Sequence, residues 1–274
     1  MDWSLALMSQ GIAPAIQRTA DGTGWQLEIE ASEYARAVQT IRQYRLENRR
    51  RRWQQPVPGT ELLFDWRALG WVGMMVVFFV LSENLSRDLR QAGCMNGAAV
   101  QGGEWWRLFT ATTLHVDLLH LGSNLVSGLV FLGLAMAIYG PGLALLAALL
   151  AGAGGNVAGL IFHSRTDLGL GASGLVMGAL GLLAVHTLAH LRAGLSGGEL
   201  LVRSFFGAVF LLVLLGFNPA SDVIAHIGGF ASGCLLGAAL TLLPAGAVKN
   251  VWLNRAAFSL CLVLTLFAWW RALH

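Results

Sequence analysis

Residues 117–165 read DLLHLGSNLVSGLVFLGLAMAIYGPGLALLAALLAGAGGNVAGLIFHSR. Between Asp117 and Arg165 this stretch contains no Asp, Glu, Lys or Arg. An apolar helix needs about 20 residues to cross a bilayer core of about 30 Å. The stretch is therefore long enough for two membrane spans, and Tyr139-Gly140-Pro141-Gly142 is a turn signal between them.

Five more apolar segments follow residue 67 and predict further spans. We number the spans along the chain, so that the two described above are the second and the third. The others are 68–82 (first), 168–191 (fourth), 204–221 (fifth), 223–248 (sixth) and 256–270 (seventh). Trp66 and Trp71 flank the first span, and a tryptophan pair ends the last, as interfacial anchors do. The sequence thus predicts an all-α polytopic membrane protein.

The composition of the whole chain agrees with a membrane protein. Of its 274 residues, 55% are hydrophobic and only 12% are charged, whereas soluble domains carry roughly 25% charged residues. This excludes a disordered chain, a nucleic-acid-binding domain and an ordinary soluble enzyme. Cys94, Cys234 and Cys261 lack the number and spacing of a disulfide framework or a zinc site.

The residues before the first span, 1–65, are polar and predict a small soluble α+β domain followed by a basic linker. Trp25, Leu27 and Ile29 alternate as in a strand. Helical spacing follows, with Ser32 as a possible N-cap. We expect an α-β-β-α order and a role in regulation or protein contact.

The linker carries Arg49-Arg50-Arg51-Arg52 directly before the membrane. A basic cluster at this place favours a cytoplasmic N-terminus. The alternative, specific lipid or nucleic-acid binding, has no supporting aromatic pattern. Compact loops suggest a bacterial inner membrane, although an organelle membrane would suit the same physics.

Three groups of polar residues fall inside the predicted spans, where each such residue is costly. His115, His120 and Asn124 begin the second span, Ser173 begins the fourth and His226 begins the sixth. Even-numbered helices run in the same direction through the membrane. The three groups are therefore predicted to share one depth.

Small residues form ridges on two of these helices. The ridges consist of Gly174, Gly178 and Gly181 on the fourth helix, and Ala225, Gly229, Gly233 and Gly237 on the sixth. Such ridges let helix backbones approach closely in lipid. Because Ser173 and His226 each lie one residue beside a ridge, we expect close packing to bring them together, whereas a mirror-image packing would separate them.

A serine hydroxyl becomes a nucleophile when a base such as histidine takes its proton. Ser173 and His226 suit these two roles, and Asn124 and His120 could donate hydrogen bonds to an oxyanion. Each residue alone also has a simpler interpretation: a small packing serine, a core or capping histidine, an interhelical amide. The combination at one depth favours the chemical interpretation.

Other polar residues leave alternatives open. Asp222 is interpreted as the N-cap of the sixth helix, although it could orient His226. His186 and His190 have a spacing that could bind a metal, but an interfacial role is favoured because no catalytic glutamate lies between them. His163 is expected at the interface.

From Trp66 to Leu243 the chain resembles the rhomboid family of intramembrane serine proteases. The motifs that carry this resemblance are Glu104-Trp105-Trp106-Arg107, His115…His120…Asn124, Gly171-Ala172-Ser173-Gly174, and Ala225-His226-Ile227-Gly228-Gly229 with Gly233. Each motif is weak alone, and their order and placement together are highly specific.

The resemblance implies a rhomboid-like six-helix bundle in residues 66–246, with 247–274 as an additional C-terminal transmembrane helix. It implies Ser173 as nucleophile and His226 as general base, without metal or organic cofactor. It also implies an oxyanion hole made of His120, Asn124 and the Ser173 backbone N–H.

Further residues have supporting roles by the same resemblance. Trp106 and Arg107 belong to a structural first loop, Gly171 precedes the nucleophile, and His115 gives structural support. Many rhomboids carry an aromatic residue four positions after the serine, where this chain has Met177, whose thioether can pack on the histidine.

The implied activity is cleavage of transmembrane segments of membrane proteins near the outer membrane face by a Ser-His dyad. Phe205, Phe206 and Phe210 on the fifth helix are a candidate lateral gate. A noncatalytic relative that binds and escorts transmembrane substrates is the alternative, and a small-molecule transporter is a weaker one. Membrane lipid and transmembrane proteins are the expected partners, and nucleic acid is not.

Overall fold

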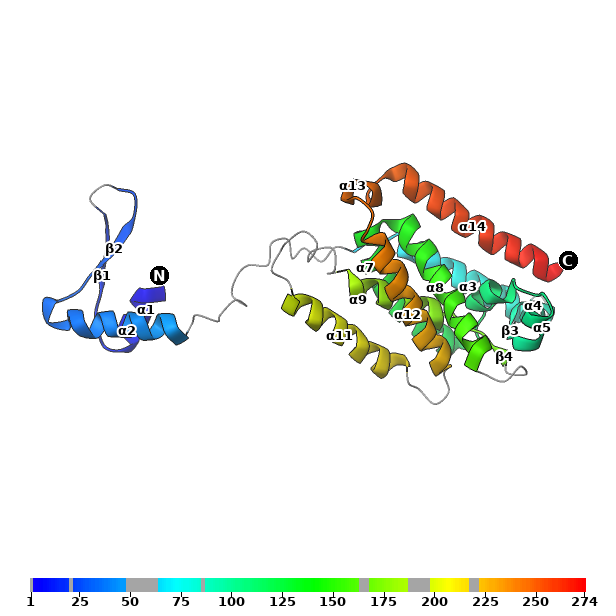
Figure 1. Cartoon of the computed structure of the whole chain (residues 1–274), viewed down its shortest axis with the longest axis horizontal. Coiled ribbons are helices and arrows are strands. Elements are labelled where there is room, and N and C mark those ends of the chain that lie inside the picture. Colours follow the sequence, from blue (N-terminus) through cyan, green and yellow to red (C-terminus); the bar gives the residue numbers. More distant parts are fainter. Residues whose placement is uncertain are drawn as a thin grey trace. The chain divides into compact units, whose positions relative to one another are not determined.

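The computed structural model describes residues 2–19, 22–47, 64–84, 87–162, 168–186, 198–216 and 222–274. The chain divides into two compact units, Met1–Glu61 and Leu62–His274. The apolar helices all belong to the second unit (Figure 1). Each unit is described by itself below.

The first unit has the predicted α-β-β-α order. Its elements are α1 (Asp2–Ser9), β1 (Ala15–Arg18), β2 (Trp25–Glu28), the 3-10 turn η1 (Ala31–Glu33) and α2 (Tyr34–Glu47). The two strands pair antiparallel, from Ala15 opposite Glu28 to Arg18 opposite Trp25. The unit thus combines a hairpin with two helices that contact each other, which confirms the small α+β character of this part of the chain.

The strand predicted from Trp25, Leu27 and Ile29 is present as β2, which ends at Glu28. Trp25 is 71% exposed, while Leu27 and Ile29 pack on the small core, because a four-residue strand beside so small a core cannot cover every large side chain. The N-cap predicted for α2 is wrong. Ser32 does not cap α2: the 3-10 turn precedes that helix, and the Ser32 hydroxyl bonds to the Glu30 carboxylate at 3.4 Å.

The second unit contains a helix at each of the seven predicted positions. They are α3 (Ala68–Asn84), α7 (Leu118–Tyr139), α8 (Pro141–Phe162), α9 (Ser173–Val185), α11 (Gly198–Gly216), α12 (Val223–Leu240) and α14 (Val251–Leu273). Among the described residues α7, α8, α12 and α14 are long and apolar enough to span a membrane, and α3, α9 and part of α11 are shorter apolar helices.

The turn between α7 and α8 is where the sequence predicted it. Gly140 has φ +84°, a conformation that favours glycine, and Pro141 then begins α8. Proline suits a first helical position because its missing N–H would have no partner there. Residues 118–162 of this stretch therefore do fold into two helices joined by a tight turn.

The fourth helix begins five residues later than predicted. Leu168–Gly169 form strand β4, which pairs with β3 (Met95–Asn96) from the loop before α7. Gly171 has φ +145°, which no helix contains, so α9 can begin only after it. The predicted end of this helix, residue 191, lies outside the described residues.

The boundaries of the last three helices also differ from prediction. The fifth, α11, begins at Gly198, and residues 217–221 lie outside the described part. The sixth, α12, ends at Leu240, because Pro244 cannot donate the backbone hydrogen bond that a continuing helix needs. A short helix, α13 (Ala245–Val248), follows, and α14 begins at Val251, earlier than predicted.

The loop between α3 and α7 is built from short elements. They are α4 (Arg87–Gly93), β3, α5 (Gly97–Gln101), α6 (Arg107–Thr110) and the 3-10 turn η3 (Ala111–Thr113). The buried Thr110 hydroxyl donates to the Gly93 carbonyl at 2.7 Å, and Asn156 of α8 donates to the Leu108 carbonyl at 2.8 Å. These bonds join the loop to itself and to the helix bundle.

Helix α9 is the centre of the bundle and contacts α7, α8, α11 and α12. All residues 174–182 are buried. Its contact with α12 is made by glycines: a Cβ on Gly229 would collide with the Gly174 backbone, and one on Gly233 with the Gly178 backbone. The predicted packing of the two small-residue ridges is confirmed.

Candidate active site

Ser173 is the first residue of α9 and is half-buried. The segment before it is fixed by two backbone donors. The Gly171 N–H donates to the Ala111 carbonyl at 3.0 Å, and the Ala172 N–H donates to His115 Nε2 at 3.5 Å. The loop before α7 thereby positions the N-terminal end of α9.

Gly171 lies between two of the predicted site residues. A Cβ built on it would lie 2.7 Å from His120 Cε1 and 3.7 Å from Ser173 Oγ. The His120 ring and the Ser173 hydroxyl therefore flank the same glycine. A larger residue would be excluded here both by the positive φ and by the His120 ring.

His115 lies just before α7, and His120 lies in its first turn. Asp117 caps the helix, with Oδ1 accepting the His120 N–H at 2.7 Å. The rings of His115 and His120 meet edge to face, with centroids 5.3 Å apart. Because His115 is fully buried and also accepts from the backbone at Ala172, it links the start of α7 to the start of α9.

Asn124 lies one turn after His120 on α7 and is only 4% exposed. Among the described residues its side-chain Nδ2 has no hydrogen-bond partner. Leaving a buried amide donor unpaired costs roughly 1–3 kcal/mol. A buried asparagine in a helix bundle ordinarily donates a hydrogen bond to another helix. In the described part of the chain, the Asn124 amide nitrogen makes no such bond.

His226 lies in the first turn of α12 and is 3% exposed. Asp222 precedes this helix, and its Oδ1 accepts the Ala225 N–H at 2.9 Å, which confirms the predicted N-cap. A Cβ on Gly174 would lie 3.6 Å from the Ala225 carbonyl oxygen. The first turns of α9 and α12 are therefore in contact, with Ser173 and His226 next to the contacting residues.

The Glu104–Arg107 motif holds the first loop together. Arg107 Nε forms an ion pair with Glu104 at 2.6 Å, and its Nη1 donates to the carbonyls of Gln91 and Cys94 at 2.9 and 2.7 Å. Arg271 of α14 lies over the Trp106 ring, 4.9 Å from its centroid. These contacts connect α4, α6 and α14.

The remaining predicted residues lie elsewhere or outside the described part. Met177 is buried within α9, one turn after Ser173. His186 ends α9 at the opposite end from Ser173, with its ring 6.0 Å from that of Tyr139. His163 and His190 lie outside the described residues. No group of His, Cys, Asp or Glu in the described residues has a metal-binding arrangement.

Sequence reasoning missed two intramembrane asparagines. Asn254 of α14 accepts from the N–H groups of Gly142 and Leu143 at 3.1 and 3.2 Å, at the start of α8. Asn156 fastens the first loop. The signal was available, because an asparagine in an apolar span is costly and demands a partner.

Together, the fold and these residues define a polytopic helical membrane protein with serine, histidine and asparagine side chains in the first two turns of α7, α9 and α12. A model of the Rhomboid domain matches residues 102–242. The chain belongs to the rhomboid family.

Individual relatives agree with this assignment. The chain is 33% identical to "Rhomboid protease GluP" of Bacillus subtilis (strain 168) over 183 residues, 63% of this chain and 34% of that protein. It is 34% identical to "RHOMBOID-like protein 4" of Arabidopsis thaliana over 157 residues, 57% of this chain and 38% of that protein. The similarity thus spans little more than a third of each of these two relatives.

Proposed function

We propose that this protein is an intramembrane serine endopeptidase in which Ser173 and His226 form the catalytic dyad. One observation carries the proposal: the glycine contact between the first turns of α9 and α12, which Ser173 and His226 flank. The match to the Rhomboid domain and the similarity to a relative named a rhomboid protease support it.

The proposed reaction begins when Ser173 Oγ attacks the carbonyl carbon of the scissile peptide bond and passes its proton to His226. The C–N bond then breaks, and the proton moves from His226 to the leaving amine. Water, deprotonated by His226, attacks the acyl carbon of the resulting acyl-enzyme. The bond from this carbon to Ser173 Oγ breaks, and His226 returns the proton to Ser173 Oγ. We assign Asp222 to the N-cap of α12 and propose a Ser-His dyad.

The oxyanion that forms in each step needs preorganised donors. We assign this role to the Asn124 side chain, the His120 ring and the Ser173 backbone N–H. The buried Nδ2 of Asn124, which lacks a partner among the described residues, supports the assignment because such a donor is available to a ligand. Gly171 keeps His120 next to Ser173, and His115 supports His120 from the loop.

The substrates are proposed to be transmembrane segments of membrane proteins. The carbonyl groups of such a helix are held in intrahelical hydrogen bonds, so the segment must unwind before attack. Helix-weakening residues near the outer end of the segment would therefore favour cleavage. Phe206 and Phe210 of α11 are largely exposed and suit a lateral entrance for such a segment.

We place the N-terminus in the cytoplasm of a bacterium and the site near the outer face of the inner membrane. The arginine cluster at 49–52 supports this orientation through the positive-inside rule. We assign no metal or organic cofactor to the reaction.

Cleavage of a helix-destabilised transmembrane substrate by the purified full chain tests the proposal. The wild type and the matched Ser127→Ala variant should cleave it, and Ser173→Ala should not. The Ser127 hydroxyl donates to the Ser123 carbonyl of its own helix, at 2.6 Å. Substrate binding without cleavage by the wild type would contradict the protease proposal and favour the escort function.

A further inference from the structure

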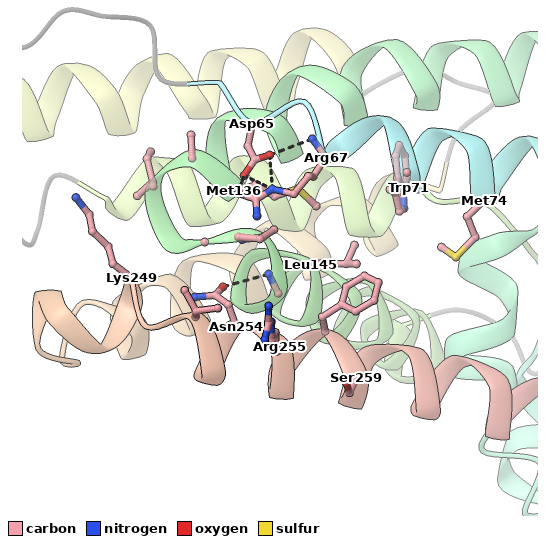
Figure 2. Close-up of a pocket in the computed structure, with 18 residues that line it drawn as sticks. Asp65, Arg67, Trp71, Met74, Met136, Leu145, Lys249, Asn254, Arg255 and Ser259 are labelled. Carbon is pink, nitrogen blue, oxygen red and sulfur yellow. Dashed lines mark hydrogen bonds and ion pairs between the residues drawn. The ribbon is translucent and has the colours of Figure 1, made fainter.

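A cavity of about 1030 Å³ lies where α3, the α7–α8 turn and the start of α14 meet (Figure 2). His120 lies in the first turn of α7, whereas the cavity is lined by the last turn of that 22-residue helix. A helix rises about 1.5 Å per residue, so the two places are separated by roughly 25–30 Å. The cavity is therefore distinct from the candidate active site.

One side of the cavity rim holds an internally neutralised pair. Arg67 binds Asp65 with two nitrogens, Nε at 2.9 Å and Nη2 at 2.7 Å. The hydrogen bond from Arg67 lowers the pKa of Asp65, so this carboxylate remains ionised and forms its ion pair with Arg67. The pair adds no net charge to the cavity.

The other side of the rim is cationic. Lys249 lies just before α14 and Arg255 near its start, on the opposite side of the cavity from Asp65 and Arg67 (Figure 2). Both are exposed, and in the described residues neither forms a salt bridge. Arg255 instead lies over the Trp252 ring, 5.1 Å from its centroid. The rim therefore has two positive charges without a carboxylate partner.

Below this rim the walls are apolar. Trp71 and Met74 of α3, Leu145 of α8 and Phe258 of α14 line the cavity. Gly70 also lines it, and a Cβ placed there would meet no atom within 4 Å. Further along the same two helices the rings of Phe78 and Trp269 stack with centroids 5.4 Å apart, so α3 and α14 are in contact beyond the cavity.

We propose that this cavity binds one anionic phospholipid, with its phosphate at Lys249 and Arg255 and an acyl chain against the apolar wall. A free phosphate would leave that wall unfilled. An apolar helix from another protein would leave two cations without partners at the rim, whereas basic residues between transmembrane helices match anionic headgroups.

Retention of added lipid by the purified full chain, measured by native mass spectrometry from detergent micelles, tests the charged rim. The probes are dioleoylphosphatidylglycerol and dioleoylphosphatidylcholine. The wild type should retain one phosphatidylglycerol in preference to phosphatidylcholine. Each basic residue near a lipid headgroup changes affinity about fivefold, so Lys249→Gln/Arg255→Gln should weaken phosphatidylglycerol binding about 25-fold.

The control for total charge is Arg18→Gln/Arg42→Gln, which removes two exposed arginines from the first unit and should retain the wild-type preference. Equal retention of both lipids by the wild type would overturn the proposal. An unchanged preference in the Lys249/Arg255 variant would overturn it as well.

A second pair of variants tests the apolar wall. Gly70→Leu should fill the cavity and weaken retention of phosphatidylglycerol at least tenfold. Gly73→Leu, also on α3 with open space around its Cβ but outside the cavity lining, should not. If Gly70→Leu changes the oligomeric mass and leaves lipid retention unchanged, the cavity is a helix-docking surface and the lipid proposal is wrong.

Discussion

The backbone carbonyl of Gly174 on α9 occupies the space that a side chain of Gly229 on α12 would need. Two glycines 55 positions apart in the chain therefore bring the backbones of α9 and α12 into contact at this level. Ser173 precedes Gly174 directly, and His226 lies one turn before Gly229. The small size of these two glycines sets the spacing on which the proposed dyad depends.

Replacing Gly229 by alanine should destabilise the bundle. The added methyl group meets the Gly174 backbone, which cannot move as a flexible side chain can, and overpacking of this kind costs about 1–3 kcal/mol. Thermal unfolding in detergent measures the change. Gly207→Ala on α11, where a Cβ meets nothing within 4 Å, should leave the unfolding temperature unchanged or raise it. Equal effects of the two substitutions would contradict the packing account.

Gly171→Ala should abolish cleavage and lower the unfolding temperature only in part. The new methyl group would be placed against His120 Cε1, at 2.7 Å, and would displace the ring from Ser173. Activity and unfolding temperature are measured on the same preparations.

Gly103→Ala is the matched control for backbone strain. Gly103 also has a positive φ, +108°, but its Cβ would meet no atom within 4 Å. It should lose stability from strain alone and keep its activity. If both variants retain cleavage, the contact between Gly171 and His120 has no catalytic importance.

Asn124→Leu should separate activity from stability. The loss of one oxyanion donor typically lowers kcat by about 10²–10³-fold. Stability should stay the same or increase, because the substitution removes a buried amide donor that has no partner in the described residues. Kinetics and thermal unfolding together check the prediction, and a variant with unchanged kcat would count against an oxyanion role for Asn124.

Asn254→Leu should loosen α14 from α8. Asn254 bonds two N–H groups at the start of α8 and also donates to the Val248 carbonyl at 2.8 Å. Its loss leaves buried donors unpaired and should cost about 2–4 kcal/mol. Asn84→Leu, which removes a side-chain bond only to its own helix, should have a much smaller effect on the unfolding temperature. A similar change in both variants would show that Asn254 does not hold the two helices together.

The positions of the membrane helices and the contact between α9 and α12 could be predicted from sequence. Gaps between charges locate apolar spans, and every-fourth-residue ridges of glycine show which helix faces can approach. The C-terminal end of α12 was also predictable, because Pro244 disrupts a continuing helix. The prediction extended to residue 248 because it followed hydrophobicity alone.

The first loop and the start of α9 could not be predicted in the same way. Strand β3 pairs with β4 across more than 70 residues of sequence, and two-residue strands give no periodic signal. The same limit applies to the contact of His115 with the backbone before Ser173. Such contacts depend on how α7 and α9 pack, which local sequence patterns do not specify.

Activation of Ser173 by His226 is tested most directly by reaction of the full chain with a fluorophosphonate probe, with the modified residue located by mass spectrometry. We predict labelling of Ser173 in the wild type and in the His186→Ala control, whose histidine lies at the far end of α9. Labelling should be lost in His226→Ala. Equal labelling of Ser173 in the wild type and in His226→Ala would contradict the account. Absence of labelling in the wild type would contradict it as well.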